Sequence, residues 1–145
     1  MTHFLYSCKA NSCQIILTNP DTLHAAILPN WKKKKAYKDL LGRLTTVVID
    51  EAHIYEGAFG AHVSMILARL HRICRVASSP SNSPFDRPKT LQYIATSATL
   101  ANPEKVARIL CPICEDEEVC VLAAEDDGSP CSSKHFFVWN PPIVE

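Results

Sequence analysis

Residues 45–63 read TTVVIDEAHIYEGAFGAHV, and this stretch determines the fold class of the chain. Its first residues are mostly β-branched, with apolar side chains on consecutive positions, as expected for a strand covered on both faces in a parallel sheet. The run ends abruptly in Asp50 and Glu51, followed by Ala52 and His53. Two carboxylates at the end of a buried strand suit a divalent cation, which prefers oxygen ligands.

The composition is typical of one globular domain with its own core, since 47% of the 145 residues are hydrophobic and 21% are charged. No apolar run approaches the ~18 residues needed to cross a bilayer, and the N-terminus lacks the residue order of a signal peptide. Seven cysteines, an odd number, suit reduced thiols better than a disulfide framework. We therefore expect a soluble intracellular protein that is neither secreted nor bound to a membrane.

Positive and negative side chains balance, so the net charge gives no electrostatic argument for a nucleic-acid partner. The charges are nevertheless segregated along the chain. Basic residues gather at Lys32–Lys35 and Lys38, whereas acidic residues gather at 115–118 and 125–127. Such runs are most often solvated surface, and we interpret them in that way.

Hydrophobic periodicity predicts strands at residues 15–17, 45–50, 91–96, 119–124 and 135–140. It predicts helices at residues 20–29, 32–44, 60–76 and 103–110, with a loop at 78–89. Asp21 would cap the first helix and Pro29 would stop it. Asn102 followed by Pro103 forms a strong start for the last helix. The alternation of strands and helices favours a layered α/β domain with a mostly parallel sheet.

Polar residues follow three of the predicted strands, as TNPD at 18–21, DEAH at 50–53 and TSAT at 96–99. Ligands of open α/β sheets bind outside the carboxyl ends of the strands, so we expect these segments to lie together. The alternative is that they are polar strand ends that face solvent without a ligand. For TNPD the alternative is a simple turn and helix cap.

The DEAH residues have a physical assignment in phosphate chemistry. An Asp held rigidly at the end of a strand can accept hydrogen bonds from the waters of a Mg²⁺ that bridges two phosphates, and Asp50 suits that role. Glu51 could then orient and deprotonate the water that attacks the γ-phosphate, as a general base. His53 could sense the γ-phosphate.

These residues resemble the motifs of superfamily-two helicases of the DExH/DEAH type. DEAH at 50–53 matches their motif II. Ser97, Ala98 and Thr99 match the motif III that links nucleotide state to the grip on nucleic acid. Longer stretches resemble the Hrq-type, RecQ-four-related ATP-dependent DNA helicases: ILTNPDTLHAAILPN, VVIDEAHIYEGAFGAHVSMILARLHRICR, ATSATLANPEKVARIL, and DDGSP followed by FFVWNPP. The resemblance spans most of residues 14–142, apart from the predicted loop.

The resemblance implies a fold. The chain would be the C-terminal part of a RecA-like (P-loop NTPase) domain with a mostly parallel sheet, running into the start of a second RecA-like domain. Residues 1–13 would be an N-terminal segment of uncertain structure, residues 14–124 the partial first domain with motifs Ib, II and III, and residues 125–145 the linker and the start of the second domain. Gly57 and Gly60 would permit a close approach of the backbone.

The resemblance also implies a function. The complete protein would be an ATP-dependent DNA helicase, active in DNA repair in the nucleus, that couples hydrolysis of Mg-ATP to translocation from 3′ to 5′ and to unwinding. ATP and Mg²⁺ would be its cofactors, and single-stranded or forked DNA its partner. Thr18, Asn19 and Asp21 match the motif Ib region of the family and would hold the phosphates of the tracking strand.

A phosphate cradle needs a glycine-rich loop that ends in Gly-Lys-Thr or Gly-Lys-Ser, because backbone amides and a lysine must neutralise the triphosphate. These 145 residues hold no such loop, since their four glycines are followed by Arg43, Ala58, Ala61 and Ser129. We therefore expect a fragment or a truncated gene model that needs the missing helicase regions in cis and is inactive alone. The alternative is a non-catalytic module, derived from a helicase, that binds nucleic acid or a partner.

Cys111 and Cys114 form a CxxC pair, with Cys120 and Cys131 downstream. A zinc knuckle would need a second tight pair, and the C-x10-C spacing of Cys120 and Cys131 does not supply one. Cys111 also continues the apolar face of the predicted helix before it. We therefore favour buried or incidental thiols over a zinc site.

Overall fold

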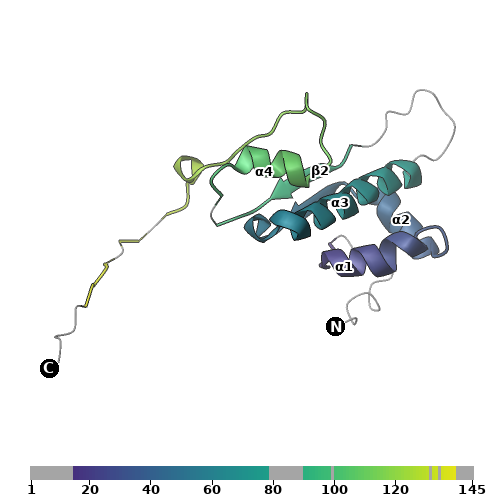
Figure 1. The fold of residues 1–145 in the computed structure, drawn as a ribbon, viewed down its shortest axis with the longest axis horizontal. Coiled ribbons are helices and arrows are strands. Elements are labelled where there is room, and N and C mark those ends of the chain that lie inside the picture. Colours follow the sequence, from purple (N-terminus) through teal and green to yellow (C-terminus); the bar gives the residue numbers. More distant parts are fainter. Residues whose placement is uncertain (1–14, 79–89, 99, 131, 134, 140–145) are drawn as a thin grey trace.

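The computed structural model describes residues 15–78, 90–98, 100–130, 132–133 and 135–139. Two strands, β1 (Thr46–Ile49) and β2 (Gln92–Ala95), pair in parallel, and helix α3 (Gly57–Ala77) lies between them in the sequence. Helices α2 (Lys35–Arg43) and α4 (Pro103–Leu110) both pack against α3 (Figure 1). This α/β arrangement with a small parallel sheet is the predicted fold class. Among the described residues, no helix combines the length and the apolar character needed to cross a membrane.

The sheet is packed on one face. The strands pair in register, with Ile49 opposite Ala95. Ile49 is buried in the core that α3 helps to form, and Val47 packs against this core. On the other face Val48 is 62% exposed and its partner Ile94 is 41% exposed. The prediction that both faces are covered is therefore wrong for the described part of the chain.

Helix α3 supplies much of the buried core. The spacing of its apolar residues predicts one stripe on the helix, made of Val63, Ile66, Leu67, Leu70 and Cys74. All five are buried, together with Gly60 and Ile73. The helix begins at Gly57 rather than at Gly60. Gly57 has φ +56°, a conformation that glycine adopts without a Cβ penalty. Gly60 allows the close approach that was predicted, because a Cβ there would overlap the backbone carbonyl oxygen of Tyr55.

A continuous helical segment precedes α2, in three parts: α1 (Pro20–Thr22), the π-helical η1 (Leu23–Ile27) and the 3₁₀-helical η2 (Leu28–Asn30). The prediction of Asp21 as its cap is wrong. Asn19 is the cap, since its Oδ1 accepts a hydrogen bond from the backbone N–H of Thr22 at 2.7 Å. The helical segment ends at Asn30, one residue after Pro29, the predicted stop.

Three predicted strands are absent from the part of the chain that the structure describes. Residues 15–17, 119–123 and 135–139 adopt no regular structure and pair with no strand there. An apolar run does not become a strand by itself, because its backbone N–H and C=O groups need a neighbouring strand. Most of their large apolar side chains are accordingly exposed. The predicted loop lies outside the described residues from position 79 to its end.

The start of α4 confirms the prediction. Pro103 stands at the beginning of the helix, and Asn102 Oδ1 accepts a hydrogen bond from the backbone N–H of Lys105 at 3.0 Å. Helix α2 likewise lies within the predicted range 32–44. Both helices are defined by local signals, a cap in one case and apolar periodicity in the other.

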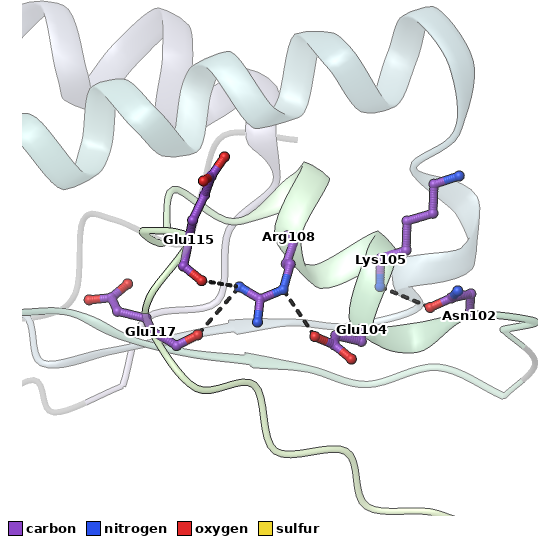
Figure 2. A network of polar contacts seen from close by, with 6 residues as sticks. All are labelled: Asn102, Glu104, Lys105, Arg108, Glu115 and Glu117. Atoms are coloured by element: carbon purple, nitrogen blue, oxygen red, sulfur yellow. Dashed lines mark hydrogen bonds and ion pairs between the residues drawn. The ribbon is translucent and has the colours of Figure 1, made fainter.

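Arg108 ties the chain after α4 back to this helix (Figure 2). Its Nε donates to Glu104 Oε1 at 3.1 Å, one turn earlier in the helix. Its Nη1 donates to the backbone carbonyl oxygens of Glu115 and Glu117, at 3.4 Å and 3.3 Å. The Glu117 carboxylate accepts in turn from the backbone N–H of Cys114 at 2.8 Å. Charge-assisted hydrogen bonds thus hold this turn where no described strand pairs with it.

A polar pair lies between α3 and β2. The rings of His71 and Tyr93 stack, with centroids 6.1 Å apart and an interplanar angle of 9°. His71 Nδ1 lies 3.2 Å from the Tyr93 hydroxyl oxygen. Burial, and secondarily the Arg75 guanidinium, lower the pKa of His71 below 6.5. Burial also raises the pKa of Tyr93, so the fold favours the neutral form of both rings.

Acidification should destabilise the fold through His71. Because its folded-state pKa lies below the unfolded value of 6.5, the unfolded state binds more protons as the pH falls. The stability that His71 contributes is present above pH 6.5 and is lost as the pH falls through the folded-state pKa. We expect His71→Gln, which keeps a polar group near Tyr93, to lose less stability than the wild type between about pH 7.5 and about pH 5.5 in urea unfolding. His135→Gln, at an exposed position, is the control, and equal slopes for His71→Gln and the wild type would contradict the prediction.

Substitution of Gly60 should reverse the usual preference of helices. Alanine is better than glycine in a helix by about 1 kcal/mol, yet at this position its Cβ would overlap the Tyr55 backbone. We expect Gly60→Ala to lower the free energy of unfolding by more than about 1 kcal/mol. The control is Ala61→Gly at the exposed neighbouring position, which should cost only the propensity difference. A Gly60→Ala variant as stable as the wild type would show that the overlap can relax.

Candidate functional site

The site lies where the two strands end. The backbone ladder continues past both of them, because the N–H of Thr96 donates to the carbonyl oxygen of Ile49 at 2.9 Å. The N–H of Ala52 then donates to the carbonyl oxygen of Thr96 at 2.8 Å. The pairing register therefore sets the DEAH and TSAT segments against one another, as predicted for the carboxyl ends of parallel strands.

Asp50 is held at this edge by two hydrogen bonds to one oxygen. The Thr96 hydroxyl donates to Asp50 Oδ1 at 2.8 Å, and the backbone N–H of Glu51 donates to the same atom at 3.0 Å. Neither bond uses Oδ2, which leaves that oxygen able to accept from a metal-bound water. Asp50 is exposed at the edge, as a residue that meets a ligand must be.

Glu51 occupies the left-handed region, with φ 52° and ψ 48°. A positive φ is uncommon for a residue other than glycine, and its cost is of the order of 1–3 kcal/mol. Contacts made by the residues before and after Glu51 hold it in this conformation. Asp50 is bonded to Thr96, and Ala52, at the start of the 3₁₀ helix η3 (Ala52–Ile54), is fully buried. The Glu51 side chain remains 57% exposed at the edge of the sheet.

His53 joins the two segments through its side chain. Its Nδ1 lies 3.3 Å from Glu51 Oε2 and 3.2 Å from the Ser97 hydroxyl oxygen. One imidazole nitrogen thus contacts both a DEAH carboxylate and the first residue of the SAT triplet. Ala98 follows at an exposed bend, and Thr99 lies outside the described residues.

The TNPD segment lies at the start of the helical segment that precedes α2. The Asn19 side chain serves as the helix cap there, and the Thr18 hydroxyl lies 3.4 Å from the carbonyl oxygen of Asn19. Asp21 is exposed in the first turn. The alternative of a turn and cap therefore accounts for Asn19. An edge contact between His24 and His62, with ring centroids 5.5 Å apart, ties this segment to α3.

The oxygen donors at the strand ends fit a hard cation that keeps most of its own waters. Asp50 and Glu51 supply carboxylate oxygens, the ligand type that Mg²⁺ prefers. No group of three or more metal-ligating side chains occurs among the residues that the structure describes. Two carboxylates suit Mg²⁺ only when substrate phosphates complete its coordination.

The cysteines lie apart from this edge in the sequence. Cys111 is buried directly after α4, and burial raises the pKa of its thiol to about 11. A thiol must lose its proton to bind zinc, so this environment disfavours Cys111 as a ligand. Cys114 and Cys120 are exposed, and Cys131 lies outside the described residues.

Thr96 is a residue that the sequence reasoning left without a role. Its hydroxyl orients Asp50 across the two strand ends, 46 positions apart in the sequence. The sequence does hold the information for this contact. When the TVVI and QYIA strands pair in register, the residues that follow them, Asp50 and Thr96, lie side by side. The register itself is set by the tertiary structure.

Comparisons with known proteins agree with this geometry. A profile of the DEAD/DEAH box helicase family matches residues 3–106. The chain is 39% identical over 133 residues to the ATP-dependent helicase HRQ1 of Saccharomyces cerevisiae, covering 92% of this chain and 11% of that protein. It is 41% identical over 130 residues to the uncharacterized ATP-dependent helicase YprA of Bacillus subtilis, covering 90% of this chain and 15% of that protein.

Solved structures of helicases are also similar to this chain. The crystal structure of the DUF1998 helicase MrfA matches with a TM-score of 0.57 at 39% identity, over 70% of this chain and 14% of that one. MrfA bound to DNA and AMPPNP matches with the same TM-score, over 12% of that chain. This chain therefore spans a small part of the length of its relatives, and the predicted resemblance to Hrq-type helicases is confirmed. With the family profile covering most of its length and its two strand ends meeting as described, the chain belongs to the DEAD/DEAH box helicase family.

Proposed function

We propose that this chain is part of an ATP-dependent DNA helicase that couples hydrolysis of Mg-ATP to translocation from 3′ to 5′ and to unwinding. The observation that carries the proposal is the meeting of the two strand ends. Asp50 bonds to Thr96, and His53 contacts Ser97, so these contacts would transmit a change at the DEAH segment to the SAT segment. Family membership supports the use of ATP.

Each residue of the DEAH segment has a separate task in the proposal. Asp50, fixed by Thr96, would accept hydrogen bonds from water bound to Mg²⁺ through its second carboxylate oxygen. Mg²⁺, when bound with ATP, neutralises charge on the phosphates. Glu51 holds the attacking water and takes its proton, which its exposed position at the edge allows. His53, held between Glu51 and Ser97, responds to the γ-phosphate.

The SAT triplet carries this response toward DNA. Ser97 contacts His53 directly, and we assign the coupling role to Ser97, Ala98 and Thr99 together. Thr18 and the backbone at the start of the first helical segment would contact the phosphates of the tracking strand. Asp21, a carboxylate in that first turn, would stabilise the helix start rather than touch phosphate. The neighbouring structure of MrfA with DNA and AMPPNP supports DNA as the partner.

A domain division accompanies the proposal. Residues 14–124 would form part of the first RecA-like domain, and residues 125–145 the linker and the start of the second. The last strand pairing among the described residues is that of β2, and after α4 only the short helix η4 (Ala124–Asp126) occurs there. Residues 1–13 are left unassigned.

The 145-residue chain should show no ATPase activity above background in the presence of Mg²⁺. Its sequence holds no Gly-Lys-Thr or Gly-Lys-Ser loop to bind the triphosphate. Mg²⁺ alone should bind only in the millimolar range or more weakly, because two carboxylates supply few of the six ligands it requires. Phosphate release and NMR titration of the Asp50 and Glu51 signals with MgCl₂ measure both. Mg²⁺-dependent hydrolysis by the purified chain, abolished in Glu51→Gln, would contradict this prediction.

In the gene product that carries these residues behind a phosphate loop, Glu51→Gln should lower kcat for ATP by about 10²–10⁴-fold, the usual loss on removing a general base. ATP binding should persist, because the amide is the same size as the carboxylate. Glu56→Gln is the matched control, since this exposed carboxylate precedes α3 and makes no capping hydrogen bond. Equal kcat for the Glu51 variant and the wild type would contradict the role of Glu51 as general base. Absence of hydrolysis in both, with DNA binding that ignores nucleotide, would favour the non-catalytic module.

A further inference from the structure

The neutral net charge of the chain conceals a strongly basic surface. Lys32–Lys35 and Lys38 lie in the turn between η2 and α2 and in the first turn of α2, and all five side chains are exposed. We call this set the basic corner. The acidic residues 125–127 belong to the segment that leaves the molecule on the side opposite α2 (Figure 1). The basic corner and the acidic residues 125–127 therefore do not offset one another locally.

The basic corner holds more positive than negative charge in its own part of the chain, since Asp39 is the one acidic residue among residues 32–43. The ion pairs of His53 with Glu51 and of Arg108 with Glu104 include no lysine of the basic corner. Asp39, four residues after Lys35, is the acidic residue that α2 itself contains. No acidic residue stands in the first turn of α2, and Lys34, the residue before the helix, makes no capping bond with its side chain. Lysines at a helix N-terminus also oppose the helix dipole, so this arrangement is unfavourable without an anion.

Two of the ammonium groups are held in place by aromatic rings. Lys32 Nζ lies 5.3 Å from the centroid of the Trp31 ring, and Lys34 Nζ lies 5.0 Å from the centroid of the Tyr37 ring. Cation–π contacts restrain a lysine without cancelling its charge. Because the lysines already cover these rings, the rings do not offer a free platform on which single-stranded bases could stack.

The compactness of the basic corner favours a duplex. One helical turn plus the adjoining turn of chain spans on the order of 10 Å. Over that length a DNA duplex presents about six phosphate charges, counting both strands, and a single strand about three. Lysine is a point charge without the planar fork that reads base edges, so the contact would be independent of sequence.

We propose that the basic corner binds the phosphate backbone of double-stranded DNA. The choice of DNA rests on the proposed function, while the surface itself does not depend on the nucleotide site. The helical segment Pro20–Asn30, about 16 Å long at 1.5 Å per residue, lies between TNPD and the basic corner. The corner would thus engage the duplex at a distance from the segment proposed to hold the tracking strand.

The test uses the 145-residue chain, without nucleotide, and a fluorescent duplex of about 20 base pairs in anisotropy titrations from about 50 to about 200 mM NaCl. The variant carries Lys32→Gln, Lys33→Gln, Lys34→Gln and Lys35→Gln together. We expect its affinity at the lowest salt to fall at least tenfold. The slope of log K against log salt should become shallower by about 0.9 for each phosphate that the variant no longer neutralises.

Two control variants test whether the loss is specific to the basic corner and whether it depends on its positive charge. Arg72→Gln, Arg75→Gln and Lys105→Gln together remove positive charges on α3 and α4, and should leave affinity and slope near wild-type values. Replacement of Lys32–Lys35 by arginine keeps the charge and should retain binding, as long as circular dichroism shows wild-type helix content for every variant.

Several results would overturn the proposal. One is an unchanged slope of log K against log salt for the variant in which Lys32–Lys35 are replaced by glutamine. Another is an equal loss of affinity in the α3 and α4 control. Tighter binding to a single strand of the same length would reject the duplex, and tighter binding to vesicles of phosphatidylcholine and phosphatidylserine would assign the basic corner to an anionic membrane surface.

Discussion

The parallel pairing of β1 with β2 governs the geometry of the core and of the site alike. Its backbone hydrogen bonds continue past both strands, through Thr96 to Ile49 and Ala52. The DEAH and TSAT segments are therefore set against one another by the peptide ladder, and the Asp50 contact follows from it. A slip of one residue would turn Ile49 out of the core and move Asp50 away from Thr96. Burial of an apolar side chain thus determines the geometry of a polar site.

The same pairing explains the unusual conformation of Glu51. Before it, Asp50 is bonded across to Thr96, and after it, Ala52 is both paired with Thr96 and fully buried. With both neighbours held, Glu51 completes the turn in the left-handed region. The strain is tolerated because the surrounding contacts outweigh it, a pattern common at functional sites. Its result is that Glu51 and His53 come within 3.3 Å at the open edge of the sheet.

Much of the fold could be predicted from local signals. The helix start at Asn102 and the apolar stripe of α3 depend on neighbours within a few turns, and both predictions are confirmed. The predictions for residues 15–17, 119–123 and 135–139 are wrong because a strand requires a partner that an apolar run does not specify. The choice of Asp21 as a cap is wrong for a smaller reason. The helix begins at Pro20, so the capping position falls on Asn19, three residues before the amide that donates to it.

Some features of the candidate site are likewise set by the sequence, and others only by the tertiary structure. The amino-acid sequence alone specifies which side chains stand after each strand, since DEAH and SAT are contiguous segments. It also specifies the clustering of positive charge at Lys32–Lys35. The contacts of Asp50 with Thr96 and of His53 with Ser97, across 46 and 44 positions, arise only in the folded chain. Such contacts follow from strand register, and register is chosen by the burial of residues distant in the sequence.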